Sequence, residues 1–232
     1  MIKKILFIAT TIALASLSAQ AQVVVYECNF ETNEQLVGMQ IANMDGDGDN
    51  WEVWNGASEI SHTGEGVAMS YSYVNSDGPR DPDNWLILPP VTLGQNAKLH
   101  FYVRGLDANW AMEHYGVFIA ETAEGATFDP EDYTSIYDAF SSAEYGDGIE
   151  LDLAEYEGKT VSIAFRHYNI TIPMFALLLD DITITDDVIS GINDVKALND
   201  DGAWYDLQGH RYGERPTTAG LYIHNGKKII IK

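Results

Sequence analysis

The strongest constraint on the fold of this chain is a repeated alternation of apolar and polar residues with a period of two. In residues 98–105, KLHFYVRG, the apolar side chains of Leu99, Phe101 and Val103 share one face and polar side chains occupy the other. Residues 160–168, TVSIAFRHY, alternate in the same way, as do the stretches GVAMSYSYV and EHYGVFIAET. Because successive residues of a β-strand point to opposite faces, this period predicts strands with one buried face.

Two continuous apolar runs, NWLILPP and MFALLLDDITIT, are bounded by proline or acidic residues and are typical of strands covered on both faces. Segments rich in turn residues, such as NSDGPRDPDN, GLDANW, YGDG and YEGK, separate the runs. The stretch FDPEDYTSIYDAF is consistent with a short helix or with an irregular strand, and its pattern does not choose between them. Many short strands joined by such turns predict an all-β sandwich.

Residues 1–21 have the features of a secretory signal peptide. Lys3 and Lys4 precede a short apolar stretch, and Ala19-Gln20-Ala21 has the small-x-small form of a cleavage site. No later segment is long and apolar enough to suggest a membrane span. Cys28 lies beyond the predicted cut rather than at it, so a lipoprotein anchor is not expected. We therefore expect an exported protein whose main domain covers residues 22–186.

The composition changes after Thr185. Residues 187–202 are polar and weakly periodic, which predicts a linker, and residues 203–232 contain short strand patterns around an Asn225-Gly226 dipeptide. This dipeptide between apolar stretches is a strong β-hairpin signal. The region after residue 187 also holds six of the 13 basic residues: Lys196, Arg211, Arg215, Lys227, Lys228 and Lys232. Because a lone hairpin is marginally stable in water, we expect this C-terminal β module either to dock onto another surface or to be handed to a partner.

The net charge limits the classes of partner that this chain is expected to bind. With 13 Lys and Arg against 35 Asp and Glu, the formal net charge is −22, and removing the two lysines of the signal peptide makes it −24. Such a surface repels nucleic acid, so a nucleic-acid partner is not expected, whereas it suits divalent cations. The alternative is that the acidity only keeps an exported protein soluble. The single cysteine excludes an internal disulfide.

The run NMDGDGDNW places Asp45, Asp47 and Asp49 at alternate positions between glycines. Either this is a solvated acidic loop, or a hard cation relieves the repulsion among three close carboxylates. Calcium takes six to eight oxygen ligands, which loops of this kind supply. An EF-hand is excluded, because its sixth and twelfth positions require Gly and Glu, and this chain has Asn50 and Gly56 there.

Two further acidic positions are candidates for the same role. Glu31 follows the first predicted strand, and the pair Asp180-Asp181 ends a long apolar run. Because neighbouring strand residues face opposite ways, we expect at most one of this pair to enter a given site. The predicted calcium ligands are Glu31, Asp45, Asp47, Asp49 and Asp181.

The chain contains no motif of a known catalytic machinery. It has no G-x-S-x-G nucleophile elbow and no H-E-x-x-H pair. Glu113-His114 and Arg166-His167 are adjacent in sequence, so alternation directs the members of each pair to opposite faces. We interpret His114 and His167 as hydrogen-bonded residues at strand ends or turns. A pair of glycosidase carboxylates can always be imagined among 35 acidic residues, so the sequence does not favour an enzyme.

Aromatic residues in and beside the predicted loops favour a binding role. We expect Trp51 and Trp85 to be buried under the loops, because large aromatic side chains are usually buried. Trp54 and Trp110 remain open between burial and recognition, since flat aromatic rings beside Asp, Asn and Arg suit sugar faces or protein side chains. The candidate ligand-binding residues are Trp54, Asp107, Asn109 and Trp110.

Five motifs occur in a fixed order: DGDGDNW, DPDNWLILPPVTL, LHFYVRGLDANWAMEHYGVFIAET, VSIAFRHYN and LLLDDITI. Over about residues 26–185 the chain closely resembles the cleaved-adhesin domains of gingipain haemagglutinin regions, also called choice-of-anchor domains. The resemblance implies a jelly-roll β-sandwich with structural calcium and an adhesin role on or beyond a bacterial outer membrane. Some family members resemble carbohydrate-binding modules. The chain departs from the family pattern at residues 170–173, ITIP, where a polar or acidic residue is usual.

The tail YDLQGHRYGERPTTAGLYIHNGKKIIIK resembles the C-terminal sorting domains of proteins exported by type IX secretion. That resemblance implies surface delivery through the type IX machinery, and the alternative is a small structural module that caps the sandwich. Together, these observations predict a secreted or cell-surface, calcium-stabilised adhesin-like module that recognises an extracellular protein or glycan. The alternative function is a carbohydrate-binding module for polysaccharide capture.

Overall fold

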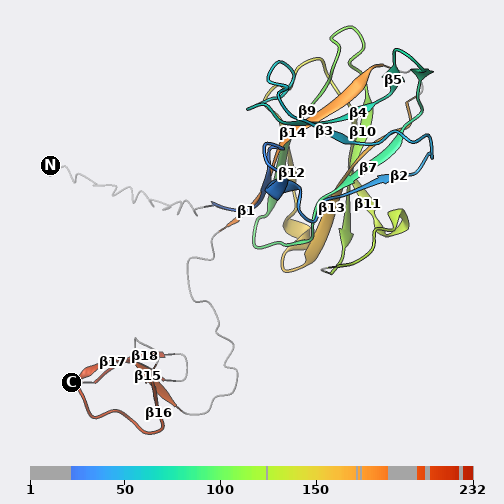
Figure 1. Ribbon diagram of the computed structural model, residues 1–232. Coiled ribbons are helices and arrows are strands. Elements are labelled where there is room, and N and C mark those ends of the chain that lie inside the picture. The colour runs from blue at the N-terminus through green and yellow to red at the C-terminus, as the bar shows by residue number, and fades with distance from the viewer. Residues whose placement is uncertain are drawn as a thin grey trace, which may run out of the picture. The chain divides into compact units, whose positions relative to one another are not determined.

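The computed structural model describes residues 22–123, 125–170, 172, 174–187, 203–206, 210–224 and 227–231. The predicted signal peptide, residues 188–202 of the predicted linker, and the Asn225-Gly226 dipeptide lie outside the described residues. The chain divides into two compact units, residues 1–188 and 189–232, each of which is described separately (Figure 1).

The larger unit contains two antiparallel sheets. The first has the strand order β12-β9-β14-β4-β3, and β1 also pairs with the long strand β14. The strands of this sheet are β1 (Gln22–Cys28), β3 (Glu52–Trp54), β4 (Val67–Tyr71), β9 (Lys98–Gly105), β12 (Ile149–Asp152) and β14 (Ala176–Asp187). Strand β14 pairs with β4 through its first residues and with β1 through its second half, so it is the central strand of this layer.

The second sheet has the order β11-β10-β13-β7-β2, with β8 paired to the start of β13. Its strands are β2 (Gln40–Asn43), β7 (Asp83–Ile87), β8 (Val91–Thr92), β10 (His114–Glu121), β11 (Thr134–Phe140) and β13 (Thr160–Tyr168). A small hairpin and three 3₁₀ turns complete the unit: β5 (Tyr73–Val74), β6 (Gly78–Pro79), η1 (Asn33–Leu36), η2 (Pro130–Asp132) and η3 (Ala154–Tyr156). The predicted all-β jelly-roll sandwich is confirmed.

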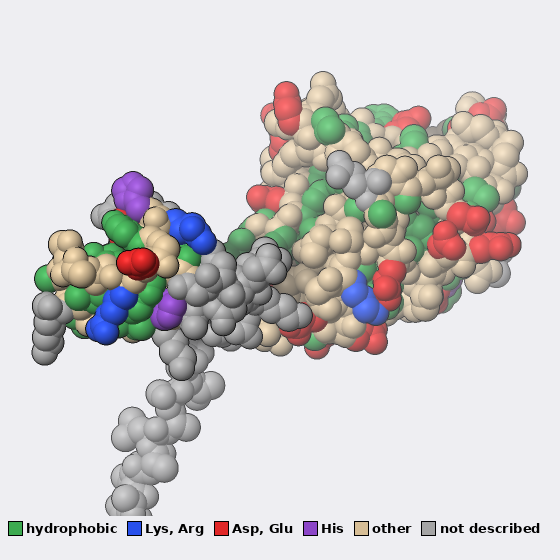
Figure 2. Space-filling view, turned by 90° about the horizontal axis from the view of Figure 1, so that it is seen from below, with side chains coloured by type: hydrophobic (Ala, Val, Ile, Leu, Met, Phe, Trp, Pro, Cys, Tyr) green, Lys and Arg blue, Asp and Glu red, His purple; other side chains and the backbone are tan. Residues whose placement is uncertain are grey.

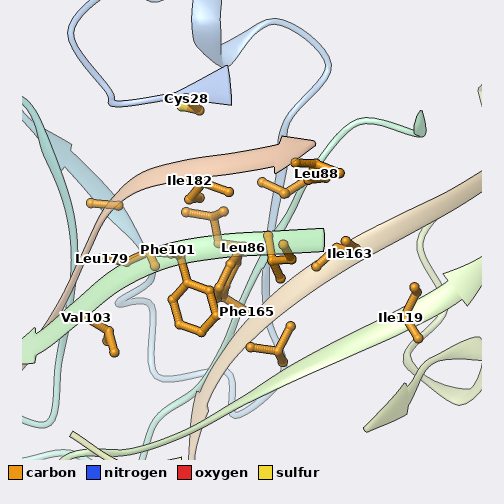
Figure 3. Packing of buried hydrophobic residues seen from close by; sticks show 14 of the residues in the cluster. Cys28, Leu86, Leu88, Phe101, Val103, Ile119, Ile163, Phe165, Leu179 and Ile182 are labelled. Atoms are coloured by element: carbon orange, nitrogen blue, oxygen red, sulfur yellow. The ribbon is translucent and has the colours of Figure 1, made fainter. Parts of the chain in front are cut away.

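The hydrophobic core lies between the two sheets and follows from the alternation in the sequence. In β9 every second side chain is buried, as the KLHFYVRG pattern predicts. Phe101 of β9 and Phe165 of β13 meet edge to face, with ring centroids 5.0 Å apart (Figure 3). Cys28 ends β1 completely buried, where it acts as a small apolar side chain. Trp51 and Trp85 are buried, as expected.

The outer face of the second sheet is covered as well. Strand β10 is buried along nearly its whole length, although its sequence pattern predicted one exposed face. The reason is that the chain after β10 folds back, so that Phe128 and Tyr133 pack on Trp85 and Phe118. The undecided stretch FDPEDYTSIYDAF begins with η2 and continues as the edge strand β11, so both of its interpretations hold in part.

The smaller unit is a four-stranded sheet with the order β16-β15-β17-β18. Its strands are β15 (Trp204–Asp206), β16 (Arg211–Tyr212), β17 (Gly220–His224) and β18 (Lys227–Ile231). The predicted hairpin is the antiparallel pair β17–β18, and two further strands widen it. Trp204, Tyr222 and Ile231 form a small core, and the ring of His224 stacks on Trp204 with centroids 4.2 Å apart. Among the described residues, no helix has the length and apolar character needed to cross a membrane.

Candidate functional site

One loop of the first sheet is held by carboxylates from distant parts of the chain. Glu31, just after β1, accepts hydrogen bonds through Oε1 from the backbone N–H groups of Glu65, at 2.7 Å, and Gly66, at 2.6 Å. Gly64 packs so closely that a Cβ added to it would lie 2.2 Å from Oε1 of Glu31, and its φ of +62° is in the left-handed region. Only glycine fits this approach without displacing Glu31.

The pair at the middle of β14 holds the other side of the same loop. Asp180 accepts a hydrogen bond through Oδ2 from the backbone N–H of His62 at 2.7 Å. Asp181 accepts one from the hydroxyl of Thr63 at 2.8 Å, and its Oδ2 lies 2.6 Å from Nδ1 of His62. Glu31, Asp180 and Asp181 with residues 61–66 are called the loop clamp below.

The loop clamp corrects the expectation that at most one of the two neighbouring aspartates enters a site. The register between β14 and β9 shifts between Asp180 and Thr183, and Asp181 has a φ of +45°. This bulge turns Asp181 to the side on which Asp180 already lies, so both carboxylates reach the loop. Alternation predicts side-chain direction only where the ladder is regular.

The electrostatics of the loop clamp are dominated by Asp180, whose side chain is completely buried. Burial raises the pKa of Asp180 to about 6, and the N–H donors of His62 and Asp181 offset part of that rise. In the described part of the chain, no Lys or Arg forms an ion pair with Asp180. The donors that the described residues offer to Asp180 are backbone N–H groups, those of His62, Thr63 and Asp181.

The acidic loop of residues 45–49 is built differently, from contacts within itself. Asp45 accepts a hydrogen bond from the N–H of Asp47 at 2.8 Å, and Asp47 accepts one from the N–H of Asp49 at 2.8 Å. Gly46 and Gly48 have φ values of +77° and +93°, which explains why glycines alternate with the aspartates. The sequence therefore encodes two consecutive Asx turns.

Further contacts join this acidic loop to neighbouring segments. The side-chain amide of Asn43, the last residue of β2, donates to Oδ1 of Asp47 at 3.1 Å and to the carbonyl oxygen of Asp49. Asp45 accepts a second hydrogen bond from the N–H of Asp83 at 2.6 Å, and Asp49 pairs with Nε of Arg80 at 2.8 Å. Burial works against ionisation of Asp45, but the N–H donors of Asp47 and Asp83 prevail and lower its pKa. Burial, together with the nearby Asp45, raises the pKa of Asp47 despite the N–H of Asp49.

The five predicted calcium ligands thus fall into two sets. Glu31 and Asp181 hold one loop together with Asp180, whereas Asp45, Asp47 and Asp49 form their own turn. Within the described residues, no three His, Cys, Asp or Glu side chains stand close enough to make a metal-binding group by themselves. Calcium coordination by either set remains a prediction.

A groove at one end of the sandwich brings together part of the predicted ligand-binding set. The cavity has a volume of about 490 Å³ and is lined by Tyr73, Asn75, Asp107, Trp110, Met174 and Phe175. These residues come from β5 and the turn after it, the β9–β10 connection and the two residues before β14; this cavity is called the end groove below. Trp110 is 54% exposed. Two of the four predicted ligand-binding residues, Asp107 and Trp110, therefore share a cavity.

The other two predicted residues have different positions. The backbone N–H of Asn109 donates to Oδ1 of Asp107 at 2.8 Å, so Asn109 shapes the turn that presents Asp107 without lining the cavity. Trp54 is 43% exposed on β3, and its Nε1 donates to Glu52 at 3.1 Å. Met174 and Phe175 were missed because they begin the apolar run MFALLLDDITIT, whose pattern predicts only a buried strand.

A buried polar network fixes one wall of the end groove. Oε1 of Glu113 accepts hydrogen bonds from the backbone N–H of Phe175 at 2.7 Å and from the hydroxyl of Ser72 at 2.8 Å. Oε2 of Glu113 lies 3.1 Å from Nε2 of His167, and Nδ1 of His167 lies 2.8 Å from Oγ of Ser70. The side chains of Glu113, His167 and both serines are completely buried. This buried network therefore holds the backbone of Phe175, which lines the end groove.

His114 confirms the alternation at this point. Glu113 points into the core, while the ring of His114 faces the other way, with Nε2 2.9 Å from Oδ1 of Asp138 and Nδ1 3.0 Å from the carbonyl oxygen of Tyr168. Both histidines singled out in the sequence are thus hydrogen-bonded residues of strands, as predicted.

The comparison with known families decides what this sandwich is. The family model described as Cleaved Adhesin Domain matches residues 23–184. The chain belongs to the cleaved adhesin family. Two curated relatives are Hemagglutinin A of Porphyromonas gingivalis and Lys-gingipain W83 of the same organism. The first is 35% identical in an alignment 175 residues long that covers 68% of this chain, and the second is 33% identical in an alignment 155 residues long that covers 61% of this chain. The matched part spans only 7% and 9% of the length of those proteins.

Solved structures agree with the family. The K3 cleaved adhesin domain of Lys-gingipain from P. gingivalis W83 superposes with a TM-score of 0.58 at 28% identity, covering 71% of this chain and 99% of that domain. The K1 cleaved adhesin domain gives a TM-score of 0.57 at 26% identity, covering 71% of this chain and 97% of that domain. The family match ends at residue 184, so the resemblance of the C-terminal tail to a type IX sorting domain remains a prediction.

Proposed function

We propose that this chain is an exported, adhesin-like binding module of the bacterial surface or its surroundings, and that the end groove contacts its extracellular protein or glycan partner. The observation that carries this proposal is a cavity in a cleaved adhesin sandwich that is lined by an exposed tryptophan and two further aromatic side chains. Partly exposed aromatic side chains in a cavity are typical anchors of recognition. Binding, and not catalysis, is the role that this arrangement favours.

The two exposed tryptophans allow a matched test. Trp110→Ala removes an aromatic wall of the end groove, whereas Trp54→Ala removes a tryptophan of similar exposure outside it. We expect full-length protein to bind a subset of an array of extracellular matrix proteins and glycans, and we expect Trp110→Ala alone to lose that binding by at least tenfold. Equal loss in both variants, or no loss in either, would contradict the assignment of the end groove. Release of product from a panel of peptide and polysaccharide substrates would contradict a purely binding role.

We further propose that the module is stabilised by calcium held at the loop clamp. Glu31, Asp180 and Asp181 would provide the carboxylate oxygens, and carbonyl groups of residues 61–66 would complete the shell, because calcium accepts both kinds of ligand. Two features support the fit: Asp180 is a buried carboxylate with no cationic partner among the described ion pairs, and glycine at position 64 lets the loop approach Glu31. When bound, calcium supplies positive charge that offsets the repulsion among these side chains.

Chelation tests the calcium proposal directly. We expect the melting temperature of the full chain to fall by about 5–10 °C when calcium at about a hundred times its dissociation constant is replaced by EDTA. Magnesium at the same concentration serves as a control for ionic strength, and we expect it to restore little of the loss because it prefers a smaller, strictly octahedral site. An unchanged melting temperature in EDTA would show that calcium is not structural in this protein.

A carbohydrate-binding module for polysaccharide capture is the second candidate function. It is favoured by the pairing of aromatic rings with the amide of Asn75 and the carboxylate of Asp107 in one cavity, since rings stack on sugar faces and polar groups bind hydroxyls. Reproducible glycan-array signals that vanish in Trp110→Ala would establish it. A blank glycan array together with Trp110-dependent protein binding would exclude it.

We also propose that the C-terminal module serves surface delivery by type IX secretion. Residues 203–232 contain five Lys and Arg against two Asp and Glu, and Figure 2 shows basic side chains on the described part of this module, whereas acidic ones are scattered over the larger unit. We expect deletion of residues 203–232 to leave the sandwich folded but to abolish its appearance outside the cell. If the truncated protein still reaches the surface and is instead less stable, the module is a structural cap.

A further inference from the structure

We infer that the end groove takes a cationic side chain, lysine or arginine, from an extended segment of a partner protein. This inference rests on the proposed binding function and names the chemistry of its ligand. It follows from three properties of the groove: the charge around it, a carboxylate within it, and the arrangement of its aromatic rings.

The domain around the end groove is strongly anionic, and its few cations are engaged elsewhere. Residues 22–188 contain five Lys and Arg against 30 Asp and Glu, a net charge of −25. Four of the five cations pair with carboxylates, and the fifth, Arg104, contacts the carbonyl oxygens of Ala143 and Ile60. The ion pairs are Arg80 with Asp49 and Asp77, Lys98–Glu150, Lys159–Glu121 and Arg166–Asp83. None of these five residues lines the end groove, so the potential there is negative and attracts basic segments.

The end groove contains one carboxylate, that of Asp107, whose position is fixed. The residue is half-buried, and its Oδ1 accepts the N–H of Asn109 at 2.8 Å. In the described hydrogen bonds and ion pairs, Oδ2 of Asp107 has no partner. A half-buried carboxylate that lines a cavity and has no Lys or Arg beside it in that lining is a site for an ammonium or guanidinium group, which donates several hydrogen bonds at once.

Aromatic rings from three separate segments line the rest of the cavity. Tyr73 comes from β5, Trp110 from the β9–β10 connection, and Phe175 from the residue before β14. The electron-rich faces of aromatic rings attract cations, and recognition of ammonium groups by several rings is a recurring use of this effect. The thioether of Met174 adds a polarisable surface that suits the alkyl stem of lysine or arginine.

The wall of the end groove that carries Phe175 is positioned before any ligand arrives. Buried Glu113 accepts the backbone N–H of Phe175 at 2.7 Å, and Ser72 accepts that of Met174 at 3.0 Å while donating to Glu113. Ser72 and Tyr73 also donate their backbone N–H groups to the carbonyl oxygen of Phe175 at 3.0 and 3.1 Å. Fixing the wall in this way reduces the ordering that binding requires.

The test uses a peptide array on which each arginine or lysine peptide stands beside the same peptide with citrulline or acetyl-lysine. These replacements keep the shape and remove the charge. Full-length protein is applied in calcium and physiological salt. We expect binding to drop at least tenfold when the charge is removed, and to drop similarly in Trp110→Ala and in Asp107→Asn. The asparagine retains an oxygen that can accept the N–H of Asn109, so the turn survives.

Two controls separate the site from general electrostatics. Glu157→Gln neutralises an exposed carboxylate next to η3 and outside the end groove, and it should leave binding within about twofold. Thermal melts should show each variant folded, and Trp110→Leu provides a second substitution if Trp110→Ala does not fold.

Each outcome has a definite meaning. Equal binding of charged and neutral peptides, or no effect of Asp107→Asn, would overturn the cation inference. Trp110-dependent binding to glycans alone would also overturn it while leaving the proposed binding function intact. If neither peptides nor glycans bind in a manner that depends on Trp110, the end groove is not the recognition site, and the proposed function fails together with the inference.

Discussion

The two groups of aspartates in this domain are held in opposite ways. The acidic loop at residues 45–49 is continuous in sequence, largely exposed, and closed by backbone N–H groups two residues ahead of each carboxylate. The loop clamp joins Glu31 with Asp180 and Asp181, nearly 150 residues away, on a single loop, and its central carboxylate is completely buried.

This difference shows that a run of acidic residues in the sequence does not mark the site where negative charge is hardest to accommodate. Asp45 and Asp47 can share their charge with solvent and with local N–H donors, so a cation is optional for them. Asp180 is buried in the protein interior, and the loss of hydration raises its pKa to about 6. A buried charge needs compensation more than an exposed one does, so calcium is more strongly expected at the loop clamp.

We expect the largest loss of stability from the replacement of Glu113, a buried carboxylate whose oxygens have hydrogen-bond partners. Glu113→Ala leaves His167 and the N–H of Phe175 without their acceptor, and we expect a loss of about 3–5 kcal/mol in the free energy of unfolding, measured by urea titration. Glu144→Ala, at an exposed glutamate, is the control and should change stability by less than about 0.5 kcal/mol. A small effect of Glu113→Ala would mean that burial of a carboxylate is tolerated more easily here than we infer.

The pH dependence of the chelated protein should report Asp180. Because its pKa in the folded protein lies above that in the unfolded chain, the folded state holds more protons between about pH 4 and 6, and this contribution to stability is lost as pH rises through that window. In EDTA, the stability of the wild type relative to Asp180→Asn should therefore fall between pH 4 and 7, by roughly 3 kcal/mol at most. A constant difference across this range would show that Asp180 is not perturbed.

Replacing one glycine by alanine in each region compares how tightly the loop clamp and the acidic loop are packed. Gly64→Ala places a Cβ against Glu31 at a left-handed φ, whereas Gly46→Ala has a left-handed φ but no atom within 4 Å of the new Cβ. We expect losses of about 2 kcal/mol or more for Gly64→Ala and about 1 kcal/mol for Gly46→Ala. Equal losses, measured by urea unfolding in calcium, would show that Glu31 moves aside freely and that the loop clamp is loosely built.

The smallest effect should come from neutralising the acidic loop. Asn can replace Asp in both turns, so Asp45→Asn combined with Asp47→Asn should change stability by less than about 1 kcal/mol. Thermal melts in calcium and in EDTA check this. If the double variant reproduces the effect of chelation on the wild type, both aspartates are calcium ligands, and the alternative interpretation of the acidic loop is correct.

Much of the fold could be predicted from the sequence because it depends on local periodicity. The alternation in β9, the burial of Cys28, Trp51 and Trp85, and the hairpin strands of the C-terminal module all follow from patterns within a few residues. The predicted exposed face of β10 was wrong because the residues that cover it, Phe128 and Tyr133, lie on a later segment that folds back. Coverage of this kind is a tertiary property.

The candidate site could be predicted only in part, for a related reason. The turn GLDANW marked Asp107 and Trp110, but Tyr73 and Phe175, which line the same cavity, come from segments far away in the sequence. Asp180 and Asp181 both contact the loop of residues 61–66 because the strand has a bulge at which the backbone φ becomes positive. No residue type in the sequence predicts this bulge. Sequence patterns fix which residues are available, and irregular backbone decides which of them meet.

The most direct test of calcium binding at the loop clamp is a calcium titration followed by melting temperature in three proteins. These are the wild type, Glu31→Gln combined with Asp181→Asn, and Asp45→Asn combined with Asp47→Asn. We predict that calcium raises the melting temperature of the first and third by about 5–10 °C and that of the second hardly at all. No rise in the wild type, or an equal rise in the Glu31 and Asp181 variant, would contradict calcium binding at the loop clamp.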